Sequence, residues 1–143
     1  MATINPYLNF PGNTEEAFNF YKSVFGGEFI MIQRYKDTPE AGTVKEEDKN
    51  KIMHIAFPIG KGNILMATDA LESMGQPLIQ GNNFYLSVGA DSDEEATKLF
   101  NSLSTGGKIT MPLAKTFWGS FFGMLVDKFG IQWMVSHEHS QAN

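Results

Sequence analysis

Two stretches of the chain space their apolar residues with the period of an α-helix. In the first, a polar cap candidate at Asn13 precedes Glu15 and Glu16, whose charges favour the positive end of a helix dipole. Gly26-Gly27 ends this stretch, because glycine accepts the left-handed conformation common at helix C-termini. A second stretch, from Asp91 to Gly107, has the same plan. The two apolar stripes are Ala17, Phe18, Tyr21, Val24 and Phe25, and Ala96, Leu99, Phe100 and Leu103.

The second helical stretch repeats the first in its residues as well as in its period. Glu15-Glu16-Ala17 aligns with Glu94-Glu95-Ala96, an offset of 79 (94 minus 15). The glycine pairs align after a slip of one residue. A cap, an acidic turn, an apolar stripe and a glycine stop recur in the same order. A period of this length is long enough for a whole folding module.

Strand candidates flank the two helices in the same order in each half. One precedes each helix and three follow it, with glycine-containing turns between the later ones. The pattern predicts an α+β chain of two βαβββ modules with curved mixed sheets: module one over 1–69, a linker over 70–83, module two over 84–138, and a frayed tail over 139–143, with fraying beginning at Glu138. Asp37–Lys51 is predicted to be a polar loop. The predicted strands are Ile4–Phe10, Glu28–Tyr35, Ile52–Ile59, Asn63–Thr68, Phe84–Gly89, Ile109–Thr116, Ser120–Val126 and Gln132–His137.

Composition narrows the possible partners. The 143 residues favour one compact domain, and a net charge of -5 argues against binding nucleic acid. The absence of cysteine excludes disulfides, thiolate metal sites and a cysteine nucleophile. No apolar run approaches a membrane span, and the first ten residues do not resemble a signal peptide. We therefore predict a cytoplasmic protein that does not associate with membranes.

Several separated blocks of the sequence resemble a known family. They include the opening 5–10, the helix with its glycine stop over 16–27, and Met53-His54-Ile55 before 65–69. The most specific blocks are Met111-Pro112-Leu113 and Thr116-Phe117-Trp118-Gly119, followed by 122–124, 127–130 and Trp133-Met134. Together they resemble the PhnB-like branch of the glyoxalase/bleomycin-resistance (vicinal oxygen chelate) superfamily.

The resemblance implies paired βαβββ modules, a homodimer, and a cavity in each curved sheet. In enzymes of the superfamily a divalent metal is bound by His, Gln or Glu on the first and last strands of the modules, and acts as a Lewis acid. Those positions fall near Pro6 or Tyr7, near Tyr85 and near Met134. None of them supplies an imidazole or a carboxylate. We therefore predict no cofactor and no metal at the usual place, although unusual ligands could still bind a divalent metal.

The sequence offers few other candidates for chemistry. His54 lies in a predicted strand and is either a hydrogen-bond partner or general base in a cavity, or a core histidine satisfied by a neighbouring strand. Trp118, at a turn between strands, is either the lid of a ligand cavity or a packing residue. Arg34 could meet an anionic ligand or could be a solvated edge charge. Thr68, Ser87 and Thr116 could supply neutral polar groups to a cavity or be ordinary strand residues.

Two further groups are weaker candidates. His137 and His139 form a His-x-His pair that indicates a metal only if other ligands converge on it. The pairs Glu15-Glu16 and Glu94-Glu95 resemble catalytic carboxylates, but their place in helix first turns favours surface residues that offset the dipole.

Two functions are the main candidates for this sequence, beside a weaker third, a structural or stress-linked partner protein with vestigial cavities. The first is a metal-independent protein that binds a small apolar or aromatic molecule in cavities lined by aromatic and methionine side chains. The second is a metal-dependent lyase, isomerase or dioxygenase. The label of ubiquinone-pathway methyltransferase, often given to this branch, has no support in the residues, since no glycine-rich loop follows a strand with a downstream acid.

Overall fold

The computed structural model describes residues 1–139, apart from the side chain of Glu40. The chain divides into two compact units, Met1–Ile79 (unit one) and Gln80–Asn143 (unit two), which we describe separately. Among the described residues, no helix is long and apolar enough to cross a membrane.

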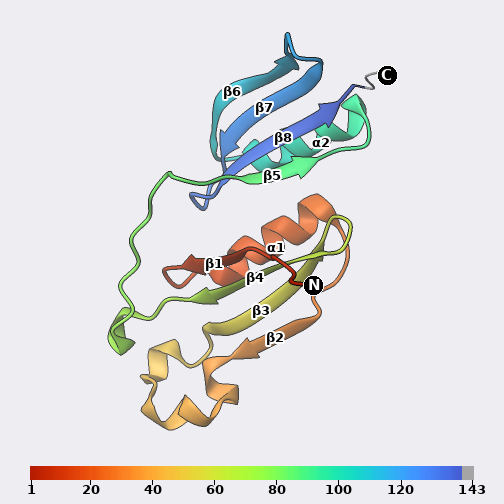
Figure 1. Cartoon of the computed structure of the whole chain (residues 1–143). Helices are drawn as coiled ribbons and strands as arrows, with labels where there is room; N and C mark the ends of the chain where they lie inside the picture. The colour runs from red at the N-terminus through yellow and green to blue at the C-terminus, as the bar shows by residue number, and fades with distance from the viewer. Residues whose placement is uncertain (140–143) are drawn as a thin grey trace. The chain divides into compact units, whose positions relative to one another are not determined.

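Unit one has one helix and a four-stranded sheet (Figure 1). The parallel pair is β1 with β4, and the other neighbours are antiparallel, in the order β1-β4-β3-β2. The elements are β1 (Tyr7–Phe10), α1 (Thr14–Phe25), β2 (Met31–Arg34), β3 (Ile52–Ile59) and β4 (Asn63–Asp69).

Unit two repeats this topology, with the strand order β5-β8-β7-β6 and a parallel pair between β5 and β8. The predicted duplication of a βαβββ module is therefore confirmed as a fold. The elements are β5 (Leu86–Gly89), α2 (Asp93–Ser104), β6 (Lys108–Lys115), β7 (Ser120–Val126) and β8 (Gln132–Glu138).

Each helix covers one face of the sheet in its own unit (Figure 1). In unit one, Ala17, Phe18 and Tyr21 of α1 are completely buried. In unit two, Ala96 and Leu103 of α2 are equally inaccessible. This burial of one apolar stripe per helix is the main stabilising contribution that the helical period predicts. The strand residues buried with them include Leu8, Phe10, Ile55, Phe57, Leu65 and Ala67 in unit one, and Leu125, Trp133 and Val135 in unit two.

The segment predicted as a polar loop is more ordered than its composition indicates. It contains two short 3-10 turns, Pro39–Thr43 and Glu46–Asp48, and a third, Tyr35–Asp37, leads into it. Val44 is buried in it and forms a small apolar cluster with Tyr35, the last residue of the preceding predicted strand, and with Leu71 from the predicted linker. A single buried apolar side chain of the loop takes part in this cluster, which a polarity pattern does not detect.

The first and last residues of several strands differ from the predictions by a few positions. β1, β2 and β5 are shorter than the stretches predicted for them, although single hydrogen bonds such as Ile30 N–H to the carbonyl of Ala56 continue the pairing beyond β2. Glu138, predicted to fray, closes β8, and the backbone N–H of His139 donates to the carbonyl of Gly119 at 3.1 Å. The rest of the predicted tail, 140–143, lies outside the described residues.

Candidate functional site

The strand register identifies which side chains lie on the sheet face opposite α1. In unit one, Met31 pairs with Ala56, Ala56 with Met66, and Met66 with Tyr7, so these four residues form one row across the sheet. The next row contains polar residues from all four strands. We call this surface the open face of unit one; it comprises Tyr7, Asn9, Met31, Gln33, His54, Ala56, Met66 and Thr68.

His54 is therefore on the open face, and it is bonded there. The hydroxyl of Tyr7 lies 3.1 Å from its Nδ1, and the two rings are 5.6 Å apart. Burial, and then the nearby Tyr35, raise the pKa of the Tyr7 phenol, so Tyr7 keeps its proton at neutral pH and is available as a donor. If Tyr7 donates to Nδ1, a neutral His54 carries its own proton on Nε2. His54 then presents an N–H donor on this face.

The open face of unit two is apolar where that of unit one is polar. Ser87 pairs with Met134, Met134 with Met124, and Met124 with Met111, so one row crosses the sheet. The open face of unit two is this row together with Gly89, Ala114, Phe122 and Ser136. Methionine side chains are flexible and polarisable, which suits contact with apolar or aromatic molecules of varied shape.

Trp118 extends this apolar surface. It lies in the turn between β6 and β7, is about half exposed, and contacts Phe122 edge-on with ring centroids 6.0 Å apart. Phe117, beside it, is almost fully exposed and packs edge-on against the indole at 5.0 Å. An aromatic pair of this kind, next to a methionine row, is an exposed apolar surface on which a planar molecule can stack.

The other predicted site residues are engaged in local structure. Arg34 forms a two-pronged pair with Glu15, at 2.9 and 2.8 Å, and also donates to the carbonyl of Asn50. The hydroxyl of Thr116 accepts from the N–H of Ser120 and donates to its carbonyl, closing the β6–β7 turn. Thr68 bonds only weakly, at 3.4 Å to the carbonyl of Ile52. The structure thus brings His54 and Thr68 to one open face, leaves Ser87 on the other, and places Arg34 and Thr116 in pairs that stabilise the fold.

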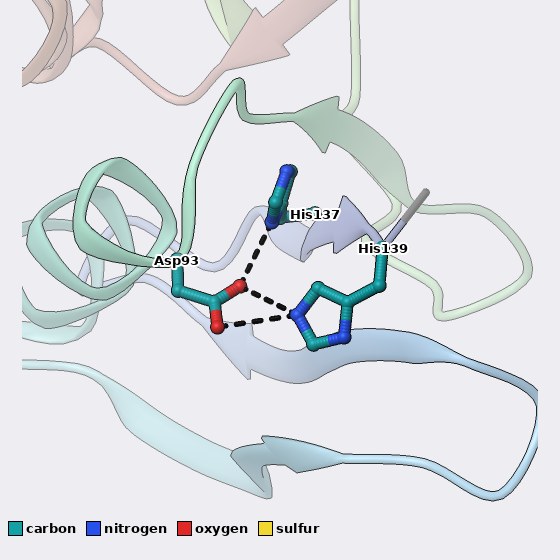
Figure 2. A group of neighbouring side chains, drawn as sticks. All are labelled: Asp93, His137 and His139. Atoms are coloured by element: carbon teal, nitrogen blue, oxygen red, sulfur yellow. Dashed lines mark hydrogen bonds and ion pairs between the residues drawn. The ribbon is translucent and has the colours of Figure 1, made fainter. Parts of the chain in front are cut away.

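Sequence reasoning missed a cluster in unit two that consists of Asp93, His137 and His139 (Figure 2). Nδ1 of His137 lies 2.8 Å from Oδ1 of Asp93, and Nε2 of His139 lies 2.9 and 3.1 Å from its two oxygens. Hydrogen bonds, first from His137 and then from His139, lower the pKa of the Asp93 carboxyl. The His-x-His spacing was visible, but its third member stands 44 residues earlier in the chain.

The residues of the open faces do not fit the metal that the family resemblance implies. The implied positions carry Tyr7, whose phenol keeps its proton beside His54, Tyr85, which directly precedes β5, and Met134, which pairs with Ser87. A divalent metal site needs imidazole or carboxylate groups that converge. Within residues 1–139, the group of His, Asp and Glu close enough together for an ion is the Asp93 cluster, on the opposite side of the sheet in unit two.

The chain matches known proteins over nearly its whole length. Residues 2–136 match the family model described as 3-demethylubiquinone-9 3-methyltransferase. Protein YjdN of Escherichia coli is 30% identical over 141 residues, which are 93% of each chain.

Solved structures agree with this match. The structure of protein PA1353 from Pseudomonas aeruginosa is 38% identical, with a TM-score of 0.87 over 98% of this chain and 100% of that one. A putative 3-demethylubiquinone-9 3-methyltransferase, PhnB protein, from Bacillus cereus is 30% identical, with a TM-score of 0.72 over 95% and 99%. A glyoxalase/bleomycin resistance protein/dioxygenase family enzyme from Burkholderia phytofirmans, at 18% identity and a TM-score of 0.63, shows the shared fold. The chain belongs to the PhnB-like family that this model and these relatives define, and it has the fold of glyoxalase/bleomycin-resistance/dioxygenase proteins.

Proposed function

We propose that this protein binds a small apolar or aromatic molecule without a metal, and that the open face of unit two makes the main contact. The observation that carries the proposal is the row Ser87–Met134–Met124–Met111, flanked by Phe122 and the half-exposed Trp118. A ligand that removes apolar surface of this kind from water makes binding more favourable.

The polar groups on each open face define what else a ligand bound to that face would carry. Ser87 is exposed at the end of the methionine row and can donate or accept one hydrogen bond. On the open face of unit one, Tyr7 occupies Nδ1 of His54 and leaves Nε2 to a ligand. Each of these groups suits a hydroxyl or carbonyl group on an otherwise apolar molecule bound to its own face. An acidic or strongly charged ligand is less well served, because Arg34 is already paired with Glu15.

The methyltransferase activity in the family description is not part of our proposal. Nothing in the open-face residues addresses a methyl donor, whereas their apolar character directly supports binding. The alternative of a metal-dependent enzyme would require ligands from unusual positions, and the Tyr7–His54 pair supplies one imidazole that is already bonded at Nδ1.

Tryptophan fluorescence provides a direct test with 2-naphthol as the probe. Trp118 is half exposed beside Phe122, while Trp133 is buried and donates to Asp127 at 2.9 Å, so the two indoles report different surroundings. We expect saturable quenching of Trp118 by 2-naphthol that is unaffected by EDTA. Its loss in Trp118→Phe would assign the signal to Trp118 itself.

A pair of matched substitutions locates the binding surface. Met124→Gln places a polar amide in the middle of the methionine row and should weaken 2-naphthol binding by about tenfold or more, the cost of roughly 1.4 kcal/mol. Met74→Gln makes the same change at an exposed site in unit one and should have no effect. Equal effects of the two variants, or no binding by the unmodified protein, would contradict the proposal. Binding that EDTA abolishes would favour the metal-dependent alternative.

A further inference from the structure

The Asp93–His137–His139 cluster joins two elements of unit two that are far apart in sequence (Figure 2). Asp93 is the first residue of α2, and His137 lies near the end of β8. The three candidate ligand atoms, one from each side chain, all lie within 4.8 Å of one another. We infer that these residues form a binding site for a divalent transition metal of the Zn²⁺ class, independent of the binding function proposed above.

The geometry of the cluster is close to what such an ion requires. Two ligand atoms at about 2.0–2.1 Å from a tetrahedral Zn²⁺ are about 3.3 Å apart, which follows from the tetrahedral angle. The two nitrogens lie 2.8 and 2.9 Å from Oδ1 of Asp93. Small rotations of the side chains would therefore open the three groups around an ion. Two imidazoles and a carboxylate are a donor set that suits Zn²⁺, and three protein ligands leave a fourth position for water.

The backbone already holds each ligand in place. In β8, alternation puts Val135 and His137 on the face that α2 covers. His139, two residues after His137 and just beyond β8, continues the same alternation. The N–H of His139 is anchored to the carbonyl of Gly119 at 3.1 Å. On the other side, the hydroxyl of Ser92 caps α2 by accepting from the N–H of Glu95 at 3.0 Å. The ligands are thus positioned before an ion arrives, which reduces the conformational entropy lost on binding.

Access and charge are also compatible with a metal. The side chains of His137, His139 and Asp93 are 24%, 33% and 44% exposed, so an ion can reach them from solvent. Their hydrogen bonds to Asp93 do not block binding, because a neutral imidazole can carry its proton on the other ring nitrogen. The acidic first turn of α2, with Glu94 and Glu95 beside Asp93, offsets the positive helix end that would otherwise repel a cation.

Such an ion would connect the start of α2 to the end of the last strand. It would bind the folded state and not the unfolded chain, and would therefore raise the stability of unit two. Because imidazoles bind metals only when deprotonated, the affinity should fall as the pH falls.

The test is calorimetric titration of the EDTA-treated protein, prepared without an affinity tag, with ZnCl₂. We expect one Zn²⁺ per chain and no saturable binding of Mg²⁺, which prefers oxygen ligands. Saturation at a hundredfold excess over Kd should raise Tm by about 5–10 °C. Co²⁺ in place of Zn²⁺ should give visible absorption bands typical of tetrahedral coordination.

Matched variants separate this site from adventitious binding. Asp93→Asn and His139→Gln keep hydrogen-bonding groups of similar size but should each weaken Zn²⁺ binding more than tenfold. His54→Gln removes the histidine in unit one and should leave the affinity unchanged. Near-ultraviolet circular dichroism, which reports the buried Trp133 of unit two, checks that each variant is folded.

Two results would overturn the inference. One is the absence of any saturable heat with Zn²⁺ in the folded, unmodified protein. The other is Zn²⁺ binding that survives the double variant Asp93→Asn, His139→Gln. In either case the three residues act only through their hydrogen bonds, which connect the start of α2 to the end of β8.

Discussion

In both units, hydrogen bonds connect the first residue of the helix to the end of the last strand, β4 or β8. The helix residue is the donor in unit one and the acceptor in unit two. In unit one, Thr14 opens α1 and donates to Asp69 at the end of β4, through its N–H at 2.9 Å and its hydroxyl at 2.7 Å. In unit two, Asp93 opens α2 and accepts from His137, near the end of β8, and from His139, just beyond it. One connection is buried and the other is half exposed.

The difference in burial determines what each connection can do. Asp69 is 1% exposed, and its second oxygen accepts from the N–H of Ile52 at 2.8 Å, so its carboxylate satisfies three buried donors. Such a group stabilises a fold but is closed to ligands. The cluster in unit two reaches solvent, so it can respond to protons and metals. Both units have this connection between helix and strand, but its chemistry differs between them.

The largest effect should come from removing the buried connection. Asp69→Ala leaves the N–H groups of Thr14 and Ile52 without an acceptor, and we expect a loss of about 3 kcal/mol or more in the free energy of unfolding. Urea denaturation would measure this loss. Glu16→Gln, an exposed carboxylate on α1, is the control and should change stability by less than about 0.5 kcal/mol. A small effect of Asp69→Ala would show that the connection in unit one is dispensable.

A milder change tests the helix side of the same connection. Thr14→Val removes only the hydroxyl bond to Asp69 and keeps the volume and the backbone N–H, so we expect a loss of about 1–2 kcal/mol. Thr97→Val on α2 is a comparable control, because its exposed hydroxyl bonds within the helix to the carbonyl of Asp93. A loss in Thr14→Val no larger than in this control would contradict the importance that we assign to burial.

The exposed connection should be sensitive to pH. The folded pKa of Asp93 lies below its ordinary value of 3.8, so the unfolded chain takes up the proton first as the pH falls. Asp93 therefore contributes stability that is present above pH 3.8 and is lost as the pH falls through its folded pKa. Urea denaturation from pH 6 to pH 2, without metal, should show the difference between the unmodified protein and Asp93→Asn shrinking over that range. A constant difference would refute this assignment.

The smallest effect is expected for the ion pair that engages a predicted site residue. Arg34→Gln breaks the pair with Glu15, whose pKa is lowered chiefly by its hydrogen bond with Arg34. The Glu15 side chain is 47% exposed, so solvent and salt screen the pair, and we expect a loss below about 1 kcal/mol that diminishes in 1 M NaCl. A larger loss of unfolding free energy that is the same in 1 M NaCl would indicate that the hydrogen bond from Arg34 to the carbonyl of Asn50 contributes more than the ion pair.

Local sequence determined the helices and their ends. The apolar stripe and the glycine stop predicted both α1 and α2, and Gly26 and Gly106 have the expected positive φ of 77° and 76°. These features are local because helix hydrogen bonds and helix-ending glycines involve residues within one or two turns. Asn13, however, makes no side-chain cap bond, and Asp69 accepts from the first N–H of α1 in its place. A cap supplied from 55 residues away is not visible in a local pattern.

The sequence by itself determined the duplicated βαβββ module and the family, and it predicted that Tyr7 and Met134 are poor metal ligands. Only the tertiary structure decided which residues meet. It brought the phenol of Tyr7 to His54, aligned three methionines in one row, and placed Asp93 between His137 and His139. Periodicity shows which face a residue occupies, but strand register and helix docking decide its neighbours across the sheet.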